Sequence, residues 1–178
     1  VVGGSGVTGT LTAVLDGAEA ALTVNGAAAT TIAAGQDASS GPATATSYTI
    51  TSTKATGLNV NVEGSTLTTD AVNVSATGAV AIDYAATVDG ETNAVEAATL
   101  SGNGAAATYT VSNNATTTTI AGDQNVTVKG VSAQLTGKTI TDSSTATSTV
   151  ELSGAGVLDA TKIAVDNINI SVDNIGNT

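Results

Sequence analysis

Aliphatic residues recur at every second position in short runs along this chain, and Thr, Asn, Ser or Asp fill the positions between them. A period of two predicts β-strands that have one apolar and one polar face. Turn residues, mainly Gly, Asn and Asp, separate these runs at intervals of roughly ten residues. The clearest predicted strands are Leu58–Val62, Val72–Val74, Val80–Tyr84, Val126–Val128, Val150–Leu152 and Ile168–Val172.

Weaker runs predict further strands, and helical patterns are nearly absent. The one helical candidate, Asp159–Lys162, is interpreted as a loop. The chain is therefore predicted to be all-β, either a β-solenoid-like stack or a β-sandwich of short strands. The weaker predicted strands are Val7–Leu15, Ala21–Val24, Tyr48–Ser52, Thr108–Ser112, Thr117–Ile120 and Lys138–Thr141.

The size of the available side chains bears on the choice between these two architectures. The only aromatic residues are Tyr48, Tyr84 and Tyr109, so a core has to be built mainly from Ala, Val, Ile, Leu and Thr. A sandwich must fill a gap of about 10 Å between its sheets, whereas stacked solenoid turns pack small side chains on one another. The small residues favour the solenoid, while the lack of a strict Gly and Asn repeat keeps the sandwich open.

Three regions are predicted along the chain. Residues 1–34 are expected to form an N-terminal β-hairpin region, and residues 35–47, with Pro42 among Gly, Ser and Ala, a linker or long loop. Residues 48–178 are expected to form the main β-rich repetitive domain. The chain begins at Val1 rather than at Met, which indicates a processed or excised segment.

The composition argues against catalysis. The chain has no His, Cys or Met, and its four basic residues are all Lys. Serine therefore has no His to deprotonate it, and no Ser-x-x-Lys motif supplies Lys as the base. A pair of acids could serve a glycosidase, but sugar clefts need more aromatic platforms than three tyrosines offer. We predict that the protein is not an enzyme.

The charge and hydropathy narrow the set of partners. The net charge of −11 argues against nucleic acid, because capture of a phosphate backbone requires clustered cations. An acidic surface either keeps a protein soluble or recruits divalent cations such as calcium. No apolar run approaches the roughly 18–20 residues of a membrane helix, so no transmembrane segment is predicted.

Several stretches resemble a known kind of protein. The segments Thr108–Ile120, Thr139–Val150 and Val150–Gly156 are similar to the Ala-, Thr-, Gly- and Val-rich repetitive regions of bacterial surface-layer proteins and large type I-secreted adhesins. The resemblance covers about residues 57–178. It implies an extracellular module at the cell surface that assembles into a lattice or filament, often with calcium. The Gly-Gly-x-Gly-x-Asp repeat that binds calcium in RTX proteins is absent. Calcium binding by this chain therefore cannot be predicted from that motif.

Two sets of polar residues are candidate sites. Calcium takes six to eight oxygen ligands, and carboxylates in Asn-rich turns could supply them, although Asp is also an ordinary turn residue. The candidates are Asp89, Glu91, Asp123, Asp142, Asp159, Asp166 and Asp173. Asn-x-Ser/Thr sequons, which also arise by chance in such a composition, mark Asn73, Asn114, Asn125 and Asn169 for glycosylation.

A third candidate site is a strand for assembly near the C-terminal end. The run 163–172 is apolar at intervals, and an unpaired strand edge can template pairing with another chain. The alternative is an ordinary internal strand. The assembly residues are Ile163, Val165, Ile168, Ile170 and Val172.

Together these features predict a noncatalytic extracellular structural module of a self-assembling surface layer, filament or adhesin. Its expected partners are copies of itself and a cell-envelope polysaccharide. The alternative is a carbohydrate- or receptor-binding module of an adhesin or phage fibre. A cleft lined by Tyr48, Tyr84 or Tyr109 would favour that alternative.

Overall fold

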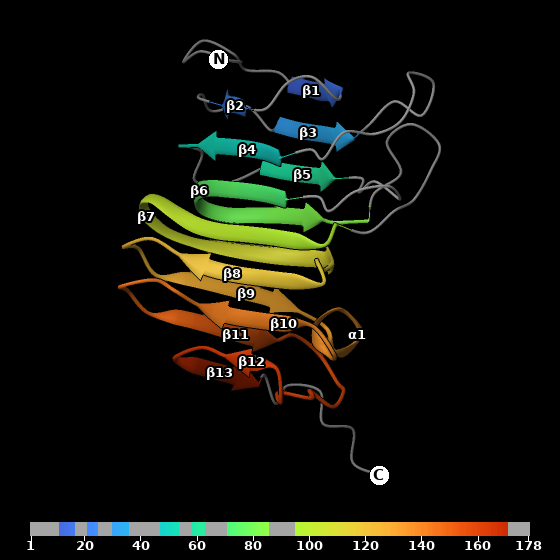
Figure 1. Cartoon of the computed structure of the whole chain (residues 1–178), viewed down its shortest axis with the longest axis vertical. Helices are drawn as coiled ribbons and strands as arrows, with labels where there is room; N and C mark the ends of the chain where they lie inside the picture. Colours follow the sequence, from blue (N-terminus) through green and yellow to red (C-terminus); the bar gives the residue numbers. More distant parts are fainter. Residues whose placement is uncertain are drawn as a thin grey trace.

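The chain winds into a parallel β-solenoid whose turns are stacked along the long axis of the molecule (Figure 1). The computed structural model describes residues 11–16, 21–24, 30–35, 47–53, 58–62, 71–85 and 95–170. Every strand pair in these residues is parallel, because each turn lies on the previous one in the same direction. The prediction of an all-β solenoid is confirmed, and the alternative of a sandwich is not what forms.

The strands form two faces, along which the chain runs in opposite directions (Figure 1). Face A consists of β2 (Ala21–Val24), β4 (Ser47–Ser52), the first part of β6 (Ala71–Asp83), the first part of β7 (Ala97–Asn113), β8 (Thr117–Ala121), β10 (Thr139–Asp142) and β12 (Ile163–Ala164). Face B consists of β1 (Leu11–Asp16), β3 (Thr30–Gly35), β5 (Leu58–Val62), the later parts of β6 and β7, β9 (Val126–Gly130), β11 (Ser148–Leu152) and β13 (Asn167–Ile170).

The turns differ in length, which explains why no strict repeat is visible in the sequence. Paired positions advance by 18 residues from Thr149 to Asn167, but by 29 from Val80 to Tyr109. The strands keep their register while the connections between them absorb the difference. A solenoid can therefore form without a fixed period.

Two glycines carry long strands around the corner between the faces. β6 and β7 each contribute to both faces, and their corners contain Gly78 at φ +75° and Gly104 at φ +72°. A side chain with a Cβ rarely adopts such a positive φ. Gly at these positions lets the backbone turn from face A to face B without leaving the stack.

The N-terminal strands differ from the predicted hairpin. β1 pairs in parallel with β3, and β2 pairs in parallel with β4, so within the described residues they continue the solenoid. A hairpin would require antiparallel neighbours joined by a tight turn. Most of the predicted linker lies outside the described residues, and the division into domains stays a prediction.

Three elements escaped the sequence pattern. β3 and the first part of β7 are rich in Ala, Gly and Thr, which give a weak strand signal on their own. The helix α1 (Ser132–Leu135) has only four residues, too few to show a helical period. In each case the element packs against neighbouring turns, and these contacts cannot be predicted from the local sequence.

The core consists of columns of inward-facing residues, one from each turn. On face B the side chains of Leu58, Val80, Tyr109, Val128 and Val150 follow one another at paired positions, and all are buried. Ile50, Val74, Leu100 and Ile120 form the matching column on face A. Dispersion contacts between successive turns and between the faces thus take the place of large aromatic anchors.

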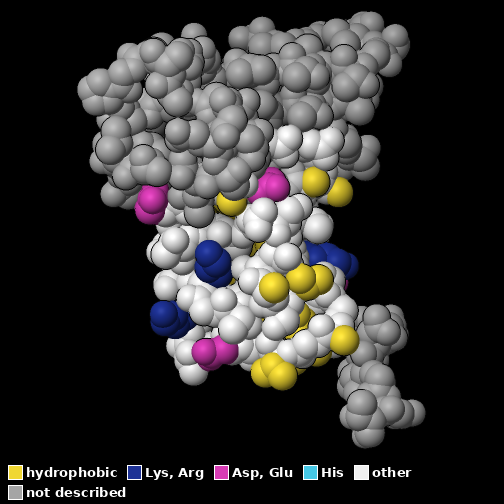
Figure 2. Space-filling model, turned by 90° about the vertical axis from the view of Figure 1, so that its right-hand side faces the viewer, with side chains coloured by type: hydrophobic (Ala, Val, Ile, Leu, Met, Phe, Trp, Pro, Cys, Tyr) yellow, Lys and Arg dark blue, Asp and Glu magenta, His cyan; other side chains and the backbone are white. Residues whose placement is uncertain are grey.

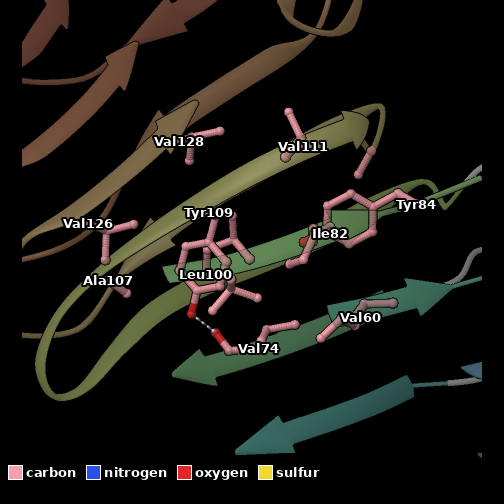
Figure 3. Packing of buried hydrophobic residues seen from close by; sticks show 14 of the residues in the cluster. Val60, Val74, Ile82, Tyr84, Leu100, Ala107, Tyr109, Val111, Val126 and Val128 are labelled. Carbon is pink, nitrogen blue, oxygen red and sulfur yellow. Dashed lines mark hydrogen bonds between the residues drawn. The ribbon is translucent and has the colours of Figure 1, made fainter. Parts of the chain in front are cut away.

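The two described tyrosine side chains lie inside this core (Figure 3). The hydroxyl of Tyr109 reaches across the interior to face A, where its oxygen lies 2.7 Å from the carbonyl oxygen of Ser101 and 3.1 Å from that of Val74. The hydroxyl of Tyr84 is buried without a hydrogen-bond partner. Burial raises the pKa of both phenols well above the ordinary value, so both stay neutral.

Candidate assembly surface

The predicted assembly strand is split between the two faces. Ile163 lies in β12 on face A, Val165 and Asp166 form the corner, and β13 begins at Asn167 on face B. The sequence pattern had suggested one strand because the aliphatic residues are nearly evenly spaced. A chain that turns a solenoid corner keeps similar spacing while changing faces. Val172 lies outside the described residues.

β13 is the last described strand of face B, and it presents aliphatic residues at the open end of the stack. Ile168 pairs with Val150 and Ile170 with Leu152, so the two isoleucines continue the inward-facing columns. Val150 and Leu152 are 0% and 1% exposed, whereas Ile168 and Ile170 are 41% and 59% exposed. Among the described strands, β13 has a neighbour on one side only, which accounts for the exposure of these positions.

The backbone edge of β13 is open at the same place. Among the described strands, β13 pairs only with β11, while β11 pairs with both β9 and β13. An edge strand presents unpaired N–H and C=O groups that can accept another strand. The exposed aliphatic side chains and the free backbone edge therefore form one surface, defined by Ile168 and Ile170 of β13, which we name the end surface.

A network around Ser148 fastens the last described turn to the one before it. The Ser148 hydroxyl donates to Asp142 Oδ2 at 2.7 Å, and the Ser148 amide donates to Asp166 Oδ2 at 2.9 Å. The amide of Asp166 in turn donates to Ser148 Oγ at 3.0 Å. Residues from β10, β11 and the β12–β13 corner thus meet at one edge of the stack.

The electrostatics of this network affect Asp142. Burial raises the pKa of the Asp142 carboxyl, but hydrogen bonds from Ser144 and Ser148 outweigh it, and the net pKa lies below the usual value. The amide of Ser144 donates to Asp142 Oδ1 at 2.7 Å. The ionised form of Asp142 is therefore the one that supports the corner.

The predicted calcium ligands are only partly brought together. Asp142 and Asp166 share Ser148 as a partner, whereas Asp123 lies at an exposed corner and Asp159 binds its own turn through Thr161. Asp89, Glu91 and Asp173 lie outside the described residues. No three acidic side chains gather into a cation site in the part of the chain that is described. Calcium binding stays a prediction.

The four sequons differ in accessibility. Asn125 and Asn169 are exposed, and Asn73 is half-buried on the outer side of β6. Asn114 is buried, and its Oδ1 accepts a hydrogen bond from Thr118 at 3.0 Å. A glycan on Asn114 would have to be attached before the chain folds, so the exposed sequons are the accessible ones in the folded protein.

In the described strands from β8 to β11, the outer sides of the two faces carry few charges. On face A the outward residues of β8 and β10 are Thr117, Thr119, Ala121, Thr139 and Thr141. On face B, Lys129 and Glu151 face each other from paired positions, with Nζ and Oε1 2.6 Å apart. Figure 2 views the molecule from the right-hand side of Figure 1, roughly along the strands, and there too uncharged side chains and backbone (white) separate small charged and hydrophobic areas.

One exposed apolar position was not anticipated. Val157, in the loop after β11, is 83% exposed, and its carbonyl oxygen accepts hydrogen bonds from Ser132 and Thr136. Val131, next to Ser132, is also exposed. The sequence offered no periodic signal here, because Val157 follows the irregular Gly154–Gly156 turn.

The tyrosines do not form an aromatic platform among the described side chains. Tyr84 and Tyr109 are fully buried, and the side chain of Tyr48 is not among those that the structure describes. Tyr84 and Tyr109 therefore act as packing residues of the core. This removes the feature that would have favoured a carbohydrate- or receptor-binding cleft at Tyr84 or Tyr109.

The sole helix in the described ranges is α1, whose four residues fall far short of the length needed to cross a membrane. Comparisons with protein-family models, with curated proteins and with solved structures gave no match.

Proposed function

We propose that this protein is a noncatalytic structural module of a self-assembling extracellular layer, filament or adhesin. The observation that supports the proposal most is the open end of the stack, where β13 carries exposed Ile168 and Ile170 beside a free backbone edge. Solenoids are stabilised by contacts between adjacent turns, and among the described strands β13 has such a neighbour on one side only. Addition of another strand would provide the missing contacts.

Further features are consistent with a scaffold. The turns are joined by continuous parallel ladders, and their core is filled by small aliphatic side chains. The similarity of residues 57–178 in composition to surface-layer and adhesin repeats suggests location at the cell surface, a cell-envelope polysaccharide as a further partner, and a contribution from calcium. The proposed work of the module is to hold an extended shape and to associate with copies of itself.

Sedimentation velocity and negative-stain electron microscopy of the purified chain test this proposal. The chain is compared with calcium and with a chelator, over a range of protein concentrations and salt concentrations. We expect ordered polymers, favoured by salt because screening weakens repulsion between copies of net charge −11. Polymers that require calcium would also support a cation site. Monomers under every condition would contradict the proposal.

A further inference from the structure

The two ends of the described stack on face B have matching free edges. Among the described strands, β1 pairs only with β3 and β13 only with β11. Both strands belong to the same set of parallel ladders and run in the same direction along face B. A second copy moved along the solenoid axis would therefore place its β1 beside β13 in the arrangement that joins every pair of successive turns.

The register of the ladders fixes how these edges would meet. Following the paired positions from Ile168 back through Val150, Val128, Tyr109, Val80, Leu58 and Thr30 leads to Leu11. Leu11 of β1 therefore occupies the same column as Ile168. Ala13 lies two positions further along β1, as Ile170 does along β13. Aliphatic residues thus stand at the corresponding positions of the two end strands.

No charged side chain on β13 opposes such a contact. Its sequence is Asn-Ile-Asn-Ile, so the strand itself has no ionisable side chain. Natural edge strands often carry charges that prevent association. β13 lacks that protection although the chain as a whole carries a net charge of −11. The contact is also more favourable when salt screens the remaining charges.

We infer that β13 of one copy pairs in parallel with β1 of a second copy, so that copies stack head to tail and the end surface becomes buried. This inference rests on the proposed function and specifies its partner and pairing. Ile168 would lie beside the partner's Leu11, and Asn169 beside the partner's Thr12. Because the contact joins different surfaces of the two copies, it repeats without closing and yields filaments.

The first test replaces the apolar residues of the end surface. We compare the full chain with Ile168→Ser/Ile170→Ser and with a matched control, Asn167→Ser/Asn169→Ser, whose changes lie at the alternate positions of the same strand. The isoleucine variant is expected to raise the concentration needed for assembly by at least about tenfold, since apolar burial is lost. The asparagine control keeps both isoleucines, so its assembly concentration is expected to shift by much less than that of the isoleucine variant.

Circular dichroism and urea unfolding of dilute samples check that the isoleucine variant folds. If a folded isoleucine variant polymerises as readily as the unchanged chain, the inference is wrong while the proposed function stands. If the unchanged chain forms no polymer, both fail. If the isoleucine variant does not fold, Ile168→Val/Ile170→Val, which shortens each side chain, is expected to shift assembly by a smaller factor in the same direction.

The second test fixes the orientation of the copies by disulfide formation. The chain has no Cys, so introduced thiols react only with each other. Adjacent strands lie about 4.8 Å apart, within the Cα separation that a disulfide spans. An equal mixture of Asn169→Cys and Thr12→Cys chains is expected to form mixed dimers under oxidation. Dimers formed by Asn169→Cys alone, with none in the mixture between the two variants, would show a tail-to-tail contact and overturn the head-to-tail pairing.

Discussion

The strands β11 and β13 are neighbours on face B, yet their inward positions have opposite environments. Val150 and Leu152 are enclosed by the turns on both sides, while Ile168 and Ile170 of the same columns lie exposed. The residues are chemically alike and in register. Among inward-facing aliphatic residues, burial therefore depends on where the turn lies in the stack, and the predictions below test that difference.

The largest effect is expected from truncating matched residues of the two strands. Leu152→Ala should lower the free energy of unfolding of the dilute protein by about 2–5 kcal/mol, because it leaves a cavity between turns. Ile170→Ala, at the adjacent position of the column, should cost less than about 1 kcal/mol. Urea denaturation of both variants provides the measurement. Equal losses would contradict the contrast between inner and terminal turns.

A second prediction compares the two buried phenols of the inner turns. Tyr109→Phe removes a hydroxyl that bonds to face A, and should cost about 1–2 kcal/mol of unfolding free energy. Tyr84→Phe removes a buried hydroxyl without a partner, so the variant should be as stable as the unchanged chain or more stable. Thermal unfolding of the pair is the measurement, and a large loss in Tyr84→Phe would show that its hydroxyl is bound.

The third prediction concerns the network that fastens the last turn. The pKa of Asp142 is lowered in the folded protein, so its ionised form adds stability above the ordinary Asp value of about 3.8. That contribution is lost as the pH falls through the folded pKa. Asp142→Asn should therefore be less stable than the unchanged chain near neutral pH, and the difference should vanish in acid.

Thermal unfolding of both chains from neutral pH down to well below pH 4 checks this expectation. The unchanged chain carries other carboxylates, so the informative quantity is the difference between the two melting temperatures at each pH. Ser148→Ala removes the shared hydroxyl and should reproduce much of the loss. A difference that stays constant through the acid range would show that the charge of Asp142 has no part in the network.

The smallest effect is expected on the outer side of the inner turns. Lys129 and Glu151 form an ion pair at paired positions, but both side chains are partly exposed. Removing it by Lys129→Gln should cost no more than about 1 kcal/mol, and the loss should shrink as salt is added. Glu151→Gln is the matched variant. A salt-independent loss in both would indicate a stronger, desolvated pair than the geometry suggests.

Much of the strand content followed from the sequence. β5 was predicted with its observed bounds, and alternation placed Leu58, Val60 and Val62 on one face, where all three are buried. Physical alternation of side chains along a strand makes this possible without knowledge of the rest of the chain. The preference for small residues also pointed towards stacked turns rather than a thick sandwich core.

The candidate site was predicted only in outline. The isoleucines of β13 were singled out, but the corner at Val165 and Asp166 that divides the run into two strands was not. The sequence also did not predict that Asp142 and Asp166 share Ser148 as a hydrogen-bond partner. The three residues come from different elements, and Asp142 and Asp166 are 24 positions apart. Long-range neighbours depend on the length of each turn, which ranges widely here.

The amino-acid sequence by itself determined the local geometry of this protein: extended strands, one apolar and one polar side to each, and side chains small enough to stack. The tertiary structure decided which apolar residues are enclosed, where the chain changes faces and which strands have a free edge. The physical reason is that the alternation of apolar and polar side chains depends only on neighbours along the chain. Burial and strand pairing depend on the turns above and below, which come into contact only when the chain winds into the solenoid.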